Sequence, residues 1–225
     1  MFISRTMTVK VIIIHPDADI FEAKEKMNTY HIRHLPVIGD NNILVGIVTD
    51  RDIRSALPSS LAKLVNGRQE GGSLSEYKVK DIMTHNPITI SPNQTIQDAL
   101  LLLQRNSIGA LPVVDESGML KGIISVRDVL RAFINVMGIA EPGIMLCIVM
   151  DQKAGQIKKI VDVITEENIR LGSILVAKYW EKDKRAVFPY LLTQNVSVVK
   201  SKLKSRGFTL LDPMKWYIDQ LPQYE

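Results

Sequence analysis

The chain has 225 residues, more than a typical single domain, and its 46% apolar and 23% charged residues are ordinary for a soluble globular protein. Its net charge of +4 includes no Lys/Arg block of the nucleic-acid-binding type, and no stretch approaches the roughly 20 apolar residues that span a bilayer. Cys147 is the only cysteine and residues 1–9 contain no signal-peptide core, so we expect a cytoplasmic protein without disulfides.

The first part of the chain predicts two short helices among three short strands. Residues 11–14 form a β-branched run that ends at a proline, so they predict a buried strand. Acids at positions 17 and 19 then precede apolar residues at helical spacing, namely Ile20, Ala23, Met27 and Tyr30. Residues 35–38 and 43–48 predict two strands joined by a polar turn, and residues 52–57 predict a helix that stops at Pro58.

The same unit occurs a second time. Residues 46–52, Gly-Ile-Val-Thr-Asp-Arg-Asp, return at 122–128 as Gly-Ile-Ile-Ser-Val-Arg-Asp, an offset of 76 residues that holds without a gap from Met7 to Ala56. Internal similarity of this kind marks repeated structural units. We therefore predict one repeat over residues 1–57 and a second over 78–138. Residues 58–77 are polar and rich in glycine, and we expect them to form a flexible linker.

The rest of the chain predicts a separate unit over residues 139–213, followed by a tail over 214–225. Residues 144–150, 174–180, 186–193 and 208–211 read as strands, whereas 157–164 and 196–203 have helical periodicity. The resulting order βαββαβ is typical of a ferredoxin-like α+β unit. We therefore expect a mixed α/β (α+β) protein with a repeated pair followed by this unit.

The repeated string admits two interpretations. Thr49 lies three residues before Asp52, and Ser125 lies three residues before Asp128. A hydroxyl and an acid at this spacing, ahead of an apolar helical run, predict a helix capping box. The same residues suit a nucleotide, because a hydroxyl at a strand end faces a helix N-terminus that favours phosphate, and a carboxylate can accept two hydrogen bonds from a ribose diol. The two roles can coexist.

Further residues would complete such a site. Arg51 and Arg127 lie beside the two acids and could reach phosphate oxygens. The apolar segments around Ile13 and Thr89 could sandwich a purine ring. Arg33 and His34 precede a Leu-Pro-Val strand, where they could face the cleft and contact phosphate.

The combined pattern resembles a tandem pair of cystathionine-β-synthase (CBS) domains, the Bateman module, over Met7 to about Val136. The resemblance implies that the pair binds an adenosine nucleotide, AMP, ADP or ATP, between its repeats. It also implies that the hydroxyl and the acid of each motif, Thr49 with Asp52 and Ser125 with Asp128, hold phosphate and ribose respectively. Modules of this family commonly pair, which implies a homodimer.

The C-terminal unit resembles an ACT domain, a small-molecule-sensing fold. Asp151 and Gly155 fall where that family often has Asp-x-Pro-Gly, although Ala154 replaces the proline, and Asn168 falls where the family often has an asparagine. The resemblance implies a ligand near these residues, while the alternative is that Gly155 makes a tight turn and the unit only dimerises. A CBS pair followed by an ACT domain resembles acetoin-utilisation regulatory proteins of the AcuB type.

Other chemistries have weaker support. The chain has four histidines, of which only His31 and His34 are close in sequence, and we expect no metal site. No nucleophile motif or phosphate-binding glycine loop is present, so we expect a sensor without enzymatic activity or catalytic cofactor. We expect it to regulate an unidentified metabolic partner protein. The alternatives are an assembly module that docks without a small ligand, and a nucleic-acid regulator, for which we find no reading helix.

Overall fold

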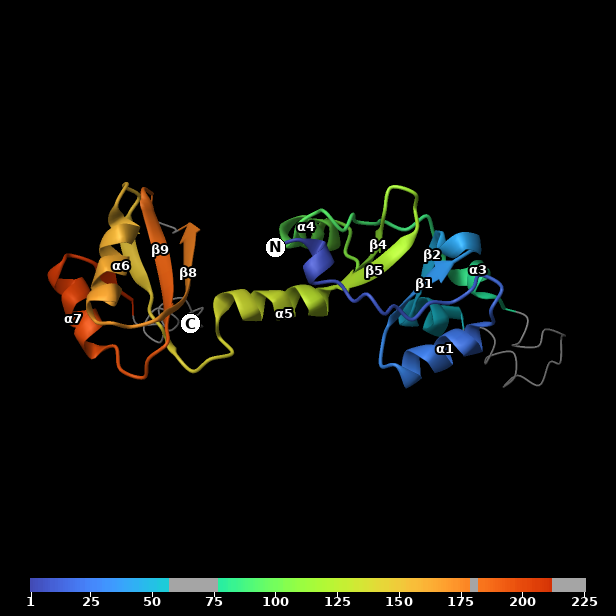
Figure 1. Ribbon diagram of the computed structural model, residues 1–225, viewed down its shortest axis with the longest axis horizontal. Helices are drawn as coiled ribbons and strands as arrows, with labels where there is room; N and C mark the ends of the chain where they lie inside the picture. Colours follow the sequence, from blue (N-terminus) through green and yellow to red (C-terminus); the bar gives the residue numbers. More distant parts are fainter. Residues whose placement is uncertain (57–76, 179–181, 212–225) are drawn as a thin grey trace, which may run out of the picture. The chain divides into compact units, whose positions relative to one another are not determined.

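A computed structural model describes residues 1–56, 77–178 and 182–211. The chain divides into two compact units, Met1–Arg131 and Ala132–Glu225. The predicted linker over residues 58–77 and the predicted tail over 214–225 lie, apart from residue 77, outside the described residues. The two units are described in turn, with elements labelled as in Figure 1.

The first repeat packs one helix against a two-stranded hairpin. Helix α1 (Ile20–Thr29) begins where Asp19 Oδ1 accepts a hydrogen bond from the backbone N–H of Glu22 at 2.8 Å. It buries Ile20, Ala23 and Met27, as the periodicity predicts, whereas Tyr30 follows the helix and is exposed. Strands β1 (His34–Ile38) and β2 (Leu44–Thr49) pair antiparallel. Residues 50–56 are helical directly after β2. This order delivers Thr49 and Asp52 to a strand end and a helix start.

The second repeat reproduces this arrangement. Its elements are α3 (Val79–Ile82), β3 (Thr84–His85), α4 (Ile96–Arg105), β4 (Ala110–Val114), β5 (Leu120–Ser125) and α5 (Val126–Met137). In β1 and β2 His34 pairs with Thr49, and 76 residues later Ala110 pairs with Ser125 in β4 and β5. The predicted repeat is therefore confirmed at the level of strand register.

Each repeat adds to its sheet a segment from the N-terminal part of the other repeat. Thr84 of β3 pairs with Ile47 of β2, and Thr8 forms a bridge to Ile123 of β5. The motif glycines explain how the segments approach so closely. A Cβ on Gly46 would lie 2.5 Å from Met83 Sδ and 3.0 Å from the carbonyl oxygen of Thr84, and Gly122 meets Met7 and Thr8 in the same way. The two repeats therefore form one folded body (Figure 1).

One predicted strand of the first repeat is wrong. Residues 11–14 form no strand and make only one ladder bridge, Ile14 to Val37. The carbonyl of Ile13 instead accepts a hydrogen bond from Lys26 Nζ at 3.2 Å, and Pro16 cannot continue a ladder. The equivalent segment of the second repeat likewise makes the single bridge Ile90 to Val113. Besides β1, the ladder neighbour of β2 is β3, a strand of two residues that the sequence pattern did not indicate.

The C-terminal unit has the element order expected from the sequence. It contains β6 (Ile144–Met145), β7 (Ile148–Asp151), α6 (Gln156–Glu166), β8 (Leu171–Lys178), β9 (Lys184–Leu191), α7 (Ser197–Ser205) and β10 (Thr209–Leu210). Strand β9 pairs with β8 on one side and with β6 and β7 on the other, while β10 pairs with β7, and all pairs are antiparallel. Helices α6 and α7 cover one face of this sheet (Figure 1) and share a core with it, including Ile160, Val199 and Ile148.

The single strand predicted over residues 144–150 is split into β6 and β7. Its register on β9 is nevertheless continuous, since Met145 pairs with Tyr190 and Ile148 pairs with Val187. The interruption lies opposite Pro189, which has no N–H to donate but accepts a hydrogen bond from the N–H of Leu146 at 3.1 Å. A proline on the neighbouring strand therefore breaks the ladder, which the pattern of residues 144–150 alone could not show.

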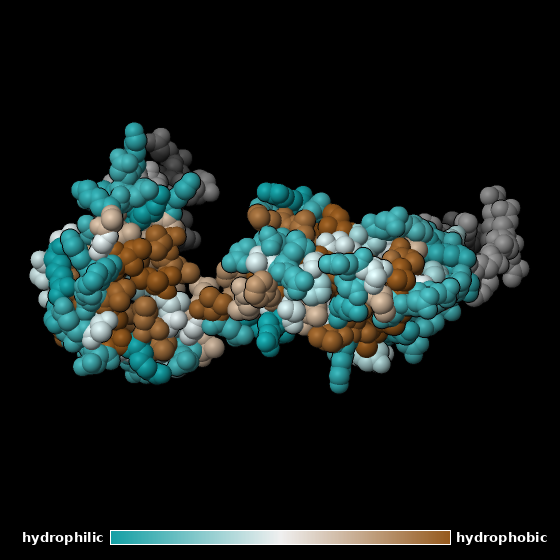
Figure 2. Space-filling view, turned by 45° about the horizontal axis from the view of Figure 1, so that its top comes forward, coloured by the Kyte–Doolittle hydropathy of each residue, from teal (hydrophilic) through white to brown (hydrophobic). Residues whose placement is uncertain are grey.

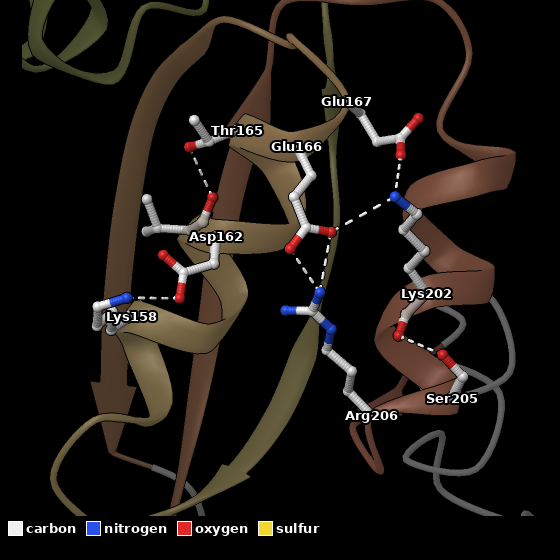
Figure 3. A network of polar contacts seen from close by, with 9 residues as sticks. Lys158, Asp162, Thr165, Glu166, Glu167, Lys202, Ser205 and Arg206 are labelled. Atoms are coloured by element: carbon white, nitrogen blue, oxygen red, sulfur yellow. Dashed lines mark hydrogen bonds and ion pairs between the residues drawn. The ribbon is translucent and has the colours of Figure 1, made fainter.

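A polar network joins the ends of α6 and α7 (Figure 3). Arg206 Nη2 lies 2.6 and 2.9 Å from the two oxygens of Glu166, and Lys202 Nζ bridges Glu166 at 3.4 Å and Glu167 at 2.5 Å. The Arg206 guanidinium holds the pKa of Glu166 below its ordinary value. These contacts fix the C-terminal turns of both helices beside one another.

Candidate functional site

The first motif forms a capping box at the end of β2. Asp52 Oδ2 accepts hydrogen bonds from the backbone N–H of Thr49 at 2.8 Å and from Thr49 Oγ1 at 2.7 Å. The backbone N–H of Asp52 in turn donates to Thr49 Oγ1 at 3.3 Å. The capping interpretation is therefore confirmed for this pair.

The second motif makes the same three bonds. Asp128 Oδ2 accepts from the backbone N–H of Ser125 at 2.9 Å and from Ser125 Oγ at 2.6 Å, and the N–H of Asp128 donates to Ser125 Oγ at 3.3 Å. Arg127, between them, is exposed. Thr95 and Asp98 form this box again at the start of α4, outside the repeated motif. The cap is therefore common local chemistry, and any binding function depends on what surrounds each motif.

A cleft of about 630 Å³ opens beside the first motif. It brings Thr49, Arg51 and Asp52 together with Arg33 and His34, as the sequence predicts for a common site. The remaining lining comes from both repeats and comprises Ile47, Asp50, Arg54, Thr84, Pro87, Ile88, Ser107, Ile108, Gly109 and Ala110. Because β3 of the second repeat pairs with β2 of the first, residues of both repeats line the same cleft.

Positive charge is available in this cleft. Arg33 and Arg51 are exposed and form no ion pair with any described residue, whereas Arg54 Nη2 pairs with Asp50 at 2.9 Å. Arg guanidinium groups bind phosphate oxygens with two parallel hydrogen bonds. One carboxylate oxygen of Asp52, Oδ1, accepts no hydrogen bond from the described residues. The cleft therefore offers donors for phosphate and an acceptor for hydroxyl groups.

His34 lies against the second repeat at the edge of the cleft. Its ring occupies the place that a Cβ on Gly109 would need, because Nε2 lies 2.8 Å from that position. Burial lowers the pKa of His34 below its ordinary 6.5, and the neighbouring Arg33 lowers it further. The imidazole is therefore neutral near pH 7 and can donate one hydrogen bond without adding charge.

The apolar lining differs from the predicted one. Ile13 and Thr89 do not line the cleft, whereas Ile47, Ile88 and Ile108 do. Ile88 directly precedes Thr89, and its side chain is 40% exposed, so a ligand in the cleft can contact it. Ile108 follows α4 of the other repeat, so no local pattern around the motif could have identified it.

The residues proposed for an ACT ligand are not brought together. Asp151 lines a small cavity of about 200 Å³, with Lys159, Lys184 and Arg206 nearby. Gly155 and Asn168 do not line it. Gly155 has a left-handed backbone, with φ of 84°, immediately before α6, and Asn168 has φ of 54° in the turn after α6. Both residues have a turn geometry that accounts for their identity without a ligand.

Other reactive groups are few in the described part of the chain. No group of three His, Cys, Asp or Glu side chains there could hold a metal ion. Cys147 is half-buried, and burial raises the pKa of its thiol, which disfavours the reactive thiolate. None of the helices in the described ranges is long and apolar enough to cross a membrane.

The sequence model of the CBS domain matches residues 3–59 and 79–135, the two repeats whose register coincides. The chain belongs to the CBS-domain family. The match covers both motifs and every residue that lines the 630 Å³ cleft.

Solved CBS-domain structures resemble the N-terminal pair. CBSX2 from Arabidopsis thaliana, in complex with AMP, is 31% identical, with a TM-score of 0.50 over 59% of this chain and 96% of that chain. The CBS pair of protein MJ0100, in complex with 5′-methylthioadenosine and S-adenosyl-L-methionine, is 26% identical, with a TM-score of 0.51 over 59% and 95%. The AcuB protein of Vibrio cholerae, named for acetoin utilization, is 26% identical, with a TM-score of 0.52 over 63% and 98%.

The fraction of each curated relative that this chain covers varies widely. A CBS domain-containing protein from Dictyostelium discoideum is 31% identical over 61% of this chain, and 94% of its own length is covered. The chain covers only 21% of the inosine-5′-monophosphate dehydrogenase of Korarchaeum cryptofilum. The shared feature is therefore the CBS pair and not a complete enzyme.

Proposed function

We propose that this protein is a non-enzymatic regulatory sensor that binds an adenosine nucleotide in the cleft beside the first motif. The observation that carries the proposal is the joint lining of one cleft by Thr49, Asp52, Arg33 and Arg51. Ligands with an adenosine moiety in the related structures of CBSX2 and MJ0100 support the choice of ligand class. The assignment of roles to individual residues is part of this proposal.

In this site each group has a distinct task. The unengaged oxygen of Asp52 would accept hydrogen bonds from the ribose hydroxyls, while Oδ2 keeps the helix cap. Arg33 and Arg51 would donate to phosphate oxygens, with Thr49 beside the helix N-terminus as a further phosphate contact. Ile47, Ile88 and Ile108 would pack against the purine. Binding would regulate a partner protein, which we place in metabolism of the acetoin-utilisation type on the resemblance to AcuB.

A ligand panel tests the proposal directly. AMP, ADP, ATP and S-adenosyl-L-methionine are each added at millimolar concentration to the full chain, and Tm and binding heat are recorded. A ligand that binds only the folded state raises Tm according to its concentration relative to Kd. We expect at least one to do so, and flat titrations with all four would leave the docking-only alternative, which predicts a specific co-purifying protein.

Two matched variants separate binding from capping. Asp52→Asn and Asp98→Asn each alter the acid of a capping box with nearly identical distances, but only Asp52 lines the cleft. Asparagine keeps a side-chain oxygen that can accept the two hydrogen bonds of the box. We expect Asp52→Asn to reduce the nucleotide-dependent rise in Tm and Asp98→Asn to leave it unchanged. Equal losses in both variants would contradict a ribose role for Asp52.

A second candidate function, dimerisation through an ACT-like C-terminal unit, has its own support. Strand β8 pairs only with β9 among the described strands, and its exposed side chains include Leu171, Leu175 and Val176. Figure 2 shows hydrophobic residues gathered on one face of this unit. Such an apolar edge strand favours pairing with another chain. We expect light scattering at micromolar concentration to give twice the 25.3 kDa of one chain. A Val176→Lys variant should shift the protein to monomer, and a monomeric parent would rule the homodimer out.

A further inference from the structure

The two motifs differ in the contacts of the carboxylate oxygen that takes no part in the helix cap, Oδ1 of Asp52 and Oδ1 of Asp128. Asp52 Oδ1 has no hydrogen-bond donor among the described residues. Asp128 Oδ1 accepts a hydrogen bond from Arg131 Nη1 at 3.4 Å, and Asp128 is 9% exposed. The position 76 residues before Arg131 is Ser55, whose side chain cannot make this contact. The acid that a ribose would need is thus open in the first motif and covered in the second.

The flanking helical positions differ as well. Asp50 and Arg54 line the first cleft as an ion pair, and their equivalents in the second repeat are Val126 and Leu130. These two apolar side chains are 52% and 59% exposed. The second motif therefore lacks the counterpart of Arg54, and its nearby basic side chains on the same segment are Arg127 within the motif and Arg131 on Asp128.

These differences would weaken binding of both the ribose and the phosphate of a nucleotide at the second motif. A ribose diol at the second motif would have to displace the Arg131 guanidinium from Asp128. An exposed ion pair is weak on its own, but Arg131 is covalently placed one helical turn from the acid and competes at high local concentration. A phosphate there would meet Val126 and Leu130 in the places of Asp50 and Arg54, and these apolar side chains cannot donate hydrogen bonds.

We infer that each chain binds one phosphorylated adenosine ligand, at the first motif, and that the second motif serves as a helix cap whose acid is covered by Arg131. This inference rests on the proposed function and names the occupied site. It assigns Ser125 and Asp128 to the start of α5, although their local hydrogen bonds match those of the first motif.

Calorimetric titration of the full chain with ATP tests the stoichiometry. We expect about one ATP per chain for the parent and for Asp128→Asn, and an affinity at least about tenfold lower for Asp52→Asn. We expect Arg131→Ser, which installs the residue found in the first repeat, to reveal a second and weaker binding event. Two equivalent sites in the parent would overturn the inference, and a single event in Arg131→Ser would overturn the role given to Arg131.

Methyl NMR of the parent protein locates the ligand without relying on a variant that has to fold. Ile47 and Ile88 line the first cleft, and Ile123 and Ile12 occupy the positions related to them by 76 residues. With ATP we expect the first two methyl signals to shift and the second two to stay. Shifts in all four would overturn this inference and leave the proposed function intact, whereas no heat and no shift would remove the proposed function itself.

Discussion

The N-terminal pair and the C-terminal unit are assembled by different routes. In the pair, Thr84 completes the sheet of the first repeat and Thr8 bridges to the second, so each repeat depends on a segment from the N-terminal part of the other. In the C-terminal unit the strands pair among themselves, and β8 and β9 form a hairpin. The cleft of the pair accordingly draws on both repeats, while the small cavity near Asp151 is lined from within its own unit. A substitution at an exchanged segment should therefore affect stability and binding together.

The largest expected effect is a loss of stability of the N-terminal pair when its two motif glycines, Gly46 and Gly122, are replaced. Gly46→Ala and Gly122→Ala place a Cβ 3.0 and 2.9 Å from backbone carbonyl oxygens, which cannot move as freely as the neighbouring methionine sulfurs. Overpacking of this kind costs about 1–3 kcal/mol per site, and roughly 2–6 kcal/mol for both if the distant sites are additive. Urea unfolding of the pair should show the loss.

Gly39→Ala provides the control for these variants. A Cβ there would meet only the Val45 side chain, at 3.2 Å, so we expect a smaller loss. The C-terminal unit, followed by the fluorescence or methyl signals of its own core, should unfold as in the parent. If Gly46→Ala and Gly122→Ala were as stable as Gly39→Ala, close approach of the exchanged segments would not explain the motif glycine.

The next effect concerns phosphate recognition in the cleft. Arg51→Ala removes a guanidinium that lines the cleft and has no ion-pair partner among the described residues. Since hydrogen bonds to charged groups contribute about 1.5–3 kcal/mol, ATP affinity should fall by roughly 10- to 150-fold, while adenosine affinity should change little. Calorimetry with both ligands measures this. Arg127→Ala, the equivalent change in the second repeat, should leave ATP binding as in the parent, and an equal loss there would argue for two similar sites.

Elements that depend on contacts within a few residues could be predicted from the sequence, whereas elements that depend on contacts between distant segments could not. Helix α1, the capping boxes and the order βαββαβ were predictable because their signals lie within a few residues, such as Asp19 before Ile20. Strand β3 was not, because two residues, Thr84 and His85, carry no periodicity and gain their pairing from another repeat. The lining residue Ile108 was missed for the same reason. The break between β6 and β7 arises from Pro189 on a different strand, so residues 144–150 contain no sign of it.

A smaller effect depends on pH and on His34. Its pKa is lowered in the folded protein by burial and by Arg33, whereas the unfolded chain has the ordinary value of 6.5. The unfolded state therefore binds more protons in the range below about 6.5, and the stability that the neutral imidazole provides is present above that pH and is lost as pH falls through the folded pKa. Thermal unfolding between pH 8 and pH 5 should show this decline. His34→Gln should flatten it, and His85→Gln, at an exposed position, should not.

The smallest expected effect lies in the C-terminal unit, at the network between α6 and α7. Arg206→Ala removes the contacts of 2.6 and 2.9 Å to Glu166, but both side chains are partly exposed and such pairs are screened by water and salt. We expect a slight loss of thermal stability that shrinks further in 1 M NaCl, and no change in ATP binding, because Arg206 is outside the cleft of the pair. Lys158→Ala, which removes a pair within α6 at 2.7 Å, is the matched control for loss of one surface charge. A loss of ATP affinity in Arg206→Ala alone would show that the two units are coupled in function, despite the separate routes by which they are assembled.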